Sequence, residues 1–82
     1  MFVIKQTIAE KGTGKIAGVN YWGKELVYCS RKESLHRMKN YVFKTELAAK
    51  REIGNINASE PYEFTDHSPL YDVTYEVIPY VA

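Results

Sequence analysis

The strongest constraint on the fold comes from two short turns that divide the first 29 residues into three segments. Residues 2–8 alternate apolar and polar side chains, which is typical of a half-buried strand. Lys11-Gly-Thr-Gly14 supplies the first turn, and the pair Gly23-Lys24, with glycine first, suits a two-residue type II′ hairpin loop. With further strands over residues 16–22 and 25–29, the sequence predicts a three-stranded antiparallel meander.

The two turns predict registers that agree with each other. A loop centred on residues 12–13 places Ile4 opposite Tyr21, and a loop at residues 23–24 places Tyr21 opposite Leu26. Both registers give one apolar face, made of Phe2, Ile4, Ile8, Ala17, Val19, Tyr21, Leu26 and Tyr28. The outward face then presents Val3, Lys5, Thr7, Asn20, Trp22, Glu25, Val27 and Cys29.

Two helices are expected after the meander. The capping box Ser30-Arg-Lys-Glu33 predicts a short helix of about two turns, with Leu35 and Met38 three residues apart on its apolar side. Thr45 is the predicted N-cap of the main helix, which runs over residues 46–53. Gly54 then follows as its C-terminal stop.

A final strand follows a long loop. Residues 71–77 alternate strictly, with Tyr71, Val73, Tyr75 and Val77 facing inward and Asp72, Thr74 and Glu76 facing water. Pro79 ends the ladder and indicates an edge strand. If this strand returns beside the first one, the pair should be parallel and the crossover right-handed. Residues 54–69 form either a long loop or a loop with a short strand at Tyr62–Phe64.

The predicted fold is therefore a single small α+β domain over residues 1–82. A three-stranded antiparallel meander is covered by one main helix at residues 46–53, and a C-terminal strand at residues 71–78 returns to the sheet. A chain of 82 residues leaves room for one compact core and no second domain.

The net charge of +1 hides an asymmetry between the two halves. Residues 1–44 contain nine Lys or Arg against three acids, a net charge of +6, whereas residues 45–82 contain two against seven, a net charge of −5. Such a split indicates a polyanionic partner for the basic half. The alternative is that the two halves neutralise each other in the fold.

Few residues favour catalysis or metal binding. Cys29 has no second cysteine with which to form an internal disulfide, and the two histidines have no ligand partners at metal-binding spacing. A Cys29–His36 nucleophilic pair is the remaining enzymatic alternative. We therefore expect a non-enzymatic protein with no cofactor and no metal. Without an apolar stretch near 18 residues or a signal-like start, the expected location is the cytoplasm.

One stretch resembles known DNA-binding domains. The step Phe43-Lys44-Thr45, followed by the small pair Ala48-Ala49, resembles the arm-binding domains of phage-type tyrosine integrases and the plant ethylene-response domains, and Trp22-Gly23-Lys24 is similar to a step in the plant domain. The resemblance covers residues 16–54. It implies a sheet lying in a DNA groove, with Trp22, Lys24, Arg37 and Lys39 as contacts. It also needs a strand over residues 37–43, so helix and strand both remain open for that segment.

The whole chain is similar in size and style to the small accessory proteins of bacteriophages. This similarity implies a phage-encoded protein that docks on a larger host protein or defence complex and modulates or inhibits it. The residues expected to make that contact are Val3, Trp22, Val27, Glu60, Glu63 and Asp66. An exposed Trp flanked by valines is typical of a binding hot spot, unless the 54–69 loop covers it.

The alternative function is nucleic-acid binding. Basic residues interleaved with aromatic ones follow a phosphate backbone and stack on bases. The residues expected to bind DNA or RNA are Lys5, Lys24, Arg31, Lys32, Arg37 and Lys39. No membrane contact is expected, and the oligomeric state stays open.

Overall fold

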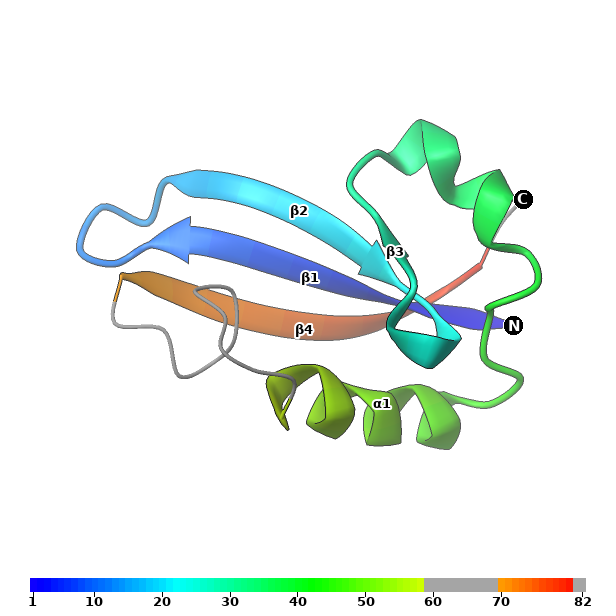
Figure 1. Cartoon of the computed structure of the whole chain (residues 1–82). Coiled ribbons are helices and arrows are strands. Elements are labelled where there is room, and N and C mark those ends of the chain that lie inside the picture. The colour runs from blue at the N-terminus through cyan, green and yellow to red at the C-terminus, as the bar shows by residue number, and fades with distance from the viewer. Residues whose placement is uncertain (59–69, 81–82) are drawn as a thin grey trace.

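The computed structural model describes residues 1–58 and 70–80 of the chain and shows a small α+β protein with one antiparallel sheet and one main helix (Figure 1). The sheet has four strands, in the order β3-β2-β1-β4. The strands are β1 (Phe2–Glu10), β2 (Ile16–Trp22), β3 (Tyr28–Cys29) and β4 (Tyr71–Pro79). The helices are α1 (Glu46–Ala58) and two 3₁₀ helices, η1 (Lys24–Leu26) and η2 (Lys32–Met38). The predicted class is confirmed, but the sheet has one strand more than the meander.

The predicted register of the first hairpin is wrong by one residue. Ile4 lies opposite Trp22, not Tyr21, and Ile8 lies opposite Gly18. Ala9 nevertheless lies opposite Ile16, which is the register predicted from the turn. The irregularity between Ile8 and Ala9 is a bulge that inserts one extra residue into β2. Every β2 side chain beyond this bulge therefore lies on the opposite face of the sheet from the predicted one.

The bulge leaves apolar side chains on both faces of the sheet, and both faces are covered. On one face α1 packs over a cluster of Ile4, Phe43, Ala49 and Ile56, with Trp22 and Tyr75 among the half-buried residues around it. On the other face η2 and the segment after it pack over Val3, Tyr21, Leu35, Met38 and Val42. Consecutive residues Val3 and Ile4 are both fully buried for this reason (Figure 1).

The predicted two-residue turn at Gly23-Lys24 is also wrong. The chain instead forms η1, in which Glu25 and Leu26 take positive φ, and β3 is reduced to Tyr28–Cys29. Gly23 has φ −119° and ψ −163°, an extended conformation open to any residue. Its lack of a side chain serves a different purpose, since a Cβ there would lie 2.5 Å from the carbonyl oxygen of Tyr41.

The two predicted helix caps have different outcomes. Leu35 and Met38 are buried as expected, but η2 begins after Arg31 and has no side-chain cap, so the predicted capping box does not form. Thr45 does cap α1, because its Oγ1 accepts a hydrogen bond of 3.1 Å from the amide of Ala48.

The main helix continues four residues beyond the predicted stop at Gly54. A glycine inside a helix costs only about 1 kcal/mol. Ile56, in the turn that follows, is 1% exposed and belongs to the core under α1. Burying such a side chain contributes about 1.5–3 kcal/mol, so the helix gains stability by continuing.

The last strand returns beside β1 at the edge of the sheet as predicted, but it runs antiparallel to β1 and not parallel. The backbone bridge between Phe2 and Phe43 ties the start of α1 to the start of β1. The helix then runs along the sheet, so the chain has already reached the far end before β4 begins (Figure 1). The alternation over residues 71–77 is confirmed. The predicted short strand at Tyr62–Phe64 lies outside the described residues.

Candidate functional site

The outward patch expected to bind a protein does not form. Val3 is fully buried under η2, whereas Trp22 lies half-buried on the opposite face, beside α1. Val27 is half-buried and lines a hollow on the η2 side. Three residues predicted to share one face therefore lie on different faces, because the bulge in β2 moves Trp22 across the sheet. Glu60, Glu63 and Asp66 lie outside the described residues.

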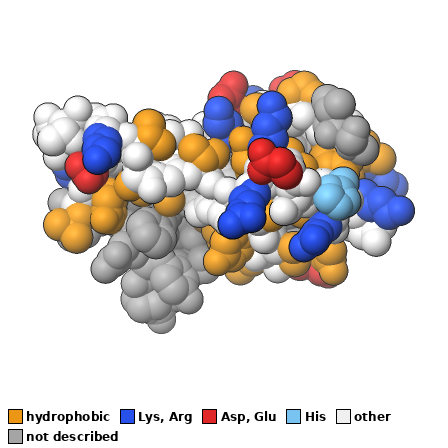
Figure 2. All heavy atoms as spheres, turned by 90° about the horizontal axis from the view of Figure 1, so that it is seen from above, with side chains coloured by type: hydrophobic (Ala, Val, Ile, Leu, Met, Phe, Trp, Pro, Cys, Tyr) orange, Lys and Arg blue, Asp and Glu red, His pale blue; other side chains and the backbone are white. Residues whose placement is uncertain are grey.

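Most of the predicted basic residues, by contrast, lie at one end of the molecule. We call this surface the basic end, and it consists of the exposed side chains Lys24, Arg31, Lys32, Arg37, Lys39 and Lys44. Within residues 24–44 only Glu25 and Glu33 are acidic, which gives this segment a net charge of +4. Figure 2, seen from the η2 side, shows basic side chains gathered over this end. Five of the six residues predicted to bind nucleic acid therefore lie at this end of the molecule, although Lys24 belongs to η1, which contacts α1, and not to the η2 side (Figure 1).

Backbone hydrogen bonds hold the parts of the basic end together. The amide of Lys24, at the start of η1, donates to the carbonyl oxygen of Tyr41 at 2.6 Å. The amide of Tyr41 in turn donates to the carbonyl oxygen of Met38, the last residue of η2, at 2.8 Å. These hydrogen bonds fix the positions of η1, η2 and the segment after η2 relative to one another. Lys5 is not among them, because it lies half-buried in the middle of the sheet between Tyr21 and Glu76.

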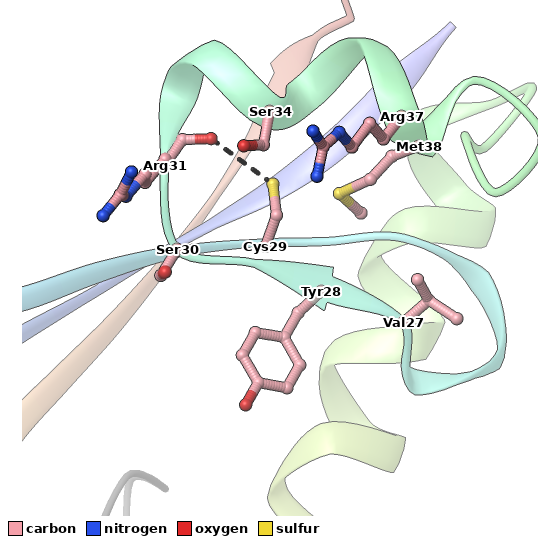
Figure 3. A pocket seen from close by; sticks show the side chains of 8 residues that line it. All are labelled: Val27, Tyr28, Cys29, Ser30, Arg31, Ser34, Arg37 and Met38. Atoms are coloured by element: carbon pink, nitrogen blue, oxygen red, sulfur yellow. Dashed lines mark hydrogen bonds between the residues drawn. The ribbon is translucent and has the colours of Figure 1, made fainter.

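An open hollow of about 430 Å³ lies between β3 and η2, on the same end of the molecule. Its lining consists of Val27, Tyr28, Cys29, Ser30, Arg31, Ser34, Arg37 and Met38. Figure 3 shows Ser34 and Arg37 extending from η2 toward Cys29, while the ring of Tyr28 points to the other side of β3. The Arg37 guanidinium and the Ser34 hydroxyl suit an anionic group, whereas the Arg31 guanidinium points away from them (Figure 3).

The hollow does not contain an activated nucleophile. The thiol of Cys29 donates to the carbonyl oxygen of Arg31 at 3.5 Å, and Nδ1 of His36 lies 2.9 Å from the carbonyl oxygen of Glu33. His36 does not line the hollow. Burial raises the pKa of the Cys29 thiol, although a backbone hydrogen bond with Arg31 offsets part of the rise. The geometry therefore gives no support to a Cys29–His36 pair.

We expect Cys29 to react slowly with iodoacetamide at about pH 7.5, because the thiolate is the reactive form and a raised pKa keeps it scarce. The alkylation rate should continue to rise as the pH passes above the ordinary range of a cysteine. The same chain unfolded in urea is the control, and it should react faster. Equal or faster labelling of the folded chain would contradict this expectation and favour the enzymatic alternative.

A buried polar network on the α1 face holds the single tryptophan in place. Oε1 of Gln6 accepts hydrogen bonds of 3.0 Å from Nε1 of Trp22 and from Nδ2 of Asn20. Nε2 of Gln6 donates to the hydroxyl of Tyr75 at 3.2 Å, and that hydroxyl donates to Oδ1 of Asn57 at 2.7 Å. Gln6 itself is fully buried.

The ring of Tyr28 stacks on this tryptophan. The ring centroids of Trp22 and Tyr28 are 4.6 Å apart, and their planes are inclined by 28°. Sequence reasoning missed both Gln6 and this stack. The signal for Gln6 was its position between Ile4 and Ile8, on a strand face expected to be buried.

No protein-family model, curated protein or solved structure matches this chain. The resemblance to integrase arm-binding domains and to phage accessory proteins therefore stays a prediction. Within residues 1–58 and 70–80, no three His, Cys, Asp or Glu side chains lie close enough to bind a metal ion. None of the described helices is long and apolar enough to span a bilayer.

Proposed function

We propose that this chain is a non-enzymatic binding protein that holds a nucleic acid against its basic end. The observation that supports the proposal best is the presence of six exposed cations on η1, η2 and the segments around them, all at one end of the molecule (Figure 1). Long basic side chains on a surface of net positive charge attract a polyanion and neutralise its phosphates.

The arrangement of these cations favours an extended polyanion over a small anion. Lys24, Arg37 and Lys44 lie on three separate segments, and all three side chains are exposed. The hollow offers the Ser34 hydroxyl beside the Arg37 guanidinium (Figure 3), and phosphate oxygens accept hydrogen bonds from both kinds of group. A phosphate backbone that crosses the basic end would thus meet both charge and hydrogen-bond donors.

Docking on a larger host protein stays a prediction with less support. It depended on a surface shared by Val3, Trp22 and Val27, which the bulge in β2 removes. Its second element, the acidic stretch with Glu60, Glu63 and Asp66, lies outside the described residues.

The test is a titration of labelled DNA at about 50 and about 200 mM salt, with the charge-reversal variant R37E/K39E beside the unmodified chain. If all six cations contact phosphates, affinity for a duplex should fall about 10³-fold between the two salt concentrations. R37E/K39E should weaken binding at low salt and reduce the slope of log affinity against log salt by about 1.8 for a duplex or about 1.4 for a single strand.

The matched control is K11E/K15E, which makes the same change in charge at the opposite end of the sheet. Lys11 and Lys15 are exposed residues of the β1–β2 loop. This variant should keep most of the affinity, because its lysines lie away from the basic end. An equal loss in both variants would show a non-specific charge effect. Absence of binding by the unmodified chain at either salt concentration would overturn the proposal and favour a protein partner.

A further inference from the structure

We infer that the nucleic acid is single-stranded, DNA or RNA, and that one of its bases stacks on the outer face of Tyr28. This inference rests on the proposed function and adds the kind of strand that the site accepts. It comes from the Trp22–Tyr28 stack, which the cation surface does not itself explain.

Tyr28 has one ring face covered and a large exposed area left over. Trp22 stacks on one face, with the two centroids 4.6 Å apart. The Tyr28 side chain is nevertheless 56% exposed, so its second face is open. Burying so much aromatic surface against another flat ring is favourable, and a nucleobase is such a ring.

The platform is fixed before any ligand arrives. Nε1 of Trp22 donates to Oε1 of the fully buried Gln6, and the indole packs against the core under α1. Tyr28 and Trp22 also lie opposite each other in the β2–β3 ladder. A base that stacks on Tyr28 therefore has little side-chain motion to suppress, which removes one of the usual costs of binding.

The platform also lies at the right place relative to the cations. The short strand β3 lies between η1 and η2 in the sequence, so Tyr28 is located at the basic end. Its ring points to the side of β3 away from the hollow that Arg37 and Ser34 line (Figure 3). A strand whose backbone meets the cations around the hollow can turn a base over the edge of β3 onto Tyr28.

Only an unpaired strand offers such a base. In a duplex the two faces of each base are occupied by its neighbours, whereas a single strand presents free faces to aromatic side chains. Stacking tolerates every base, because each has a flat aromatic face. The site should therefore prefer single strands to duplexes and show weak sequence preference.

The experiment compares Y28A, Y28F and I16A for binding to a labelled 12-nucleotide DNA, the same sequence as RNA, and a 12-base-pair duplex. Y28A should weaken single-strand binding about 5- to 150-fold, the range for losing one stacked base. Duplex binding should change by less than about twofold. Y28F keeps the ring and should bind like the unmodified chain. I16A is the matched control, since Ile16 is 55% exposed at the opposite end of β2.

Trp22 gives a second readout, because it is the single tryptophan of the chain. Its emission should be quenched by unlabelled single strands and not by duplex. Unchanged single-strand affinity in Y28A, together with a loss in R37E/K39E, would overturn the stacking inference and leave the proposed function standing. Absence of binding in the unmodified chain would overturn both. A difference between the DNA and RNA arms would identify which sugar the site accepts.

Discussion

Replacing Gly23 with Ala is expected to lower the free energy of unfolding by about 3 kcal/mol, at the upper end of the range for an overpacked site. The new Cβ would lie 2.5 Å from the carbonyl oxygen of Tyr41, 2.9 Å from its Cβ and 3.1 Å from Cε of Met38. The methyl of Met38 can move aside, but the carbonyl cannot. It is held by a 2.6 Å hydrogen bond from the amide of Lys24, so the clash also breaks this bond.

Thermal unfolding followed by circular dichroism would measure this loss. For a domain of this size, about 3 kcal/mol corresponds to a fall in Tm of about 12–24 °C. Gly18→Ala is the matched control, because Gly18 lies in β2, the strand that Gly23 directly follows, and a Cβ there meets no atom within 4 Å. It should be neutral or slightly stabilising. An equal fall in both variants would mean that glycine flexibility matters and not the close approach of Tyr41.

The features predicted correctly are those that depend on neighbouring residues. The alternation over residues 71–77 decides which side chains of β4 face the core, whatever strand lies beside it. The hydroxyl of Thr45 caps α1 through an amide three residues away. Leu35 and Met38 are buried because both project from the same side of a short helix. Each of these signals depends on residues that are only a few positions apart in the sequence.

The features predicted wrongly depend on contacts between distant segments. A single extra residue in β2 moves Trp22 to the helix face, and no local pattern marks that bulge. Gly23 favours a hairpin turn locally, but its partner is Tyr41, eighteen residues later. Gly54 is a good helix stop, but burial of Ile56 against the sheet outweighs it. Tertiary packing decides each of these cases.

The candidate site follows the same division. Arg31, Lys32 and Arg37 were predictable as surface cations because long charged side chains are almost never fully buried. The protein-binding patch was predicted wrongly, because the prediction required Val3 and Trp22 to lie on the same face of the sheet. The Tyr28 stack depends on the β2–β3 pairing, and η1 sets that register in place of the predicted two-residue turn.

Replacing Gln6 with Leu is expected to lower the free energy of unfolding by about 3 kcal/mol, since each buried donor left without an acceptor costs about 1–3 kcal/mol. Nε1 of Trp22 and Nδ2 of Asn20 both lose Oε1 of Gln6, at 3.0 Å in each case. An indole N–H is only a donor, so Trp22 needs an oxygen at this position and leucine offers none. Melting followed by circular dichroism measures the loss.

Two further variants test whether the loss of stability comes from the hydrogen-bond network or from replacing any polar side chain with an apolar one. Thr74→Val, an exposed position on β4, should change stability by less than about 0.5 kcal/mol. Tyr75→Phe removes the hydroxyl that accepts from Nε2 of Gln6. Because the two residues belong to one network, the double variant should lose less than the sum of the single losses. Additive losses would show that Gln6 and Tyr75 act independently.

The Gln6→Leu variant also connects the core to the proposed site. Gln6 fixes the indole on which Tyr28 stacks, so its loss should loosen the platform even where the chain is still folded. At a temperature well below its Tm, the variant should therefore bind single strands more weakly while duplex binding and the salt dependence stay unchanged. If single-strand binding were also unchanged, Gln6 would stabilise the core alone and the orientation of Trp22 would not matter for binding.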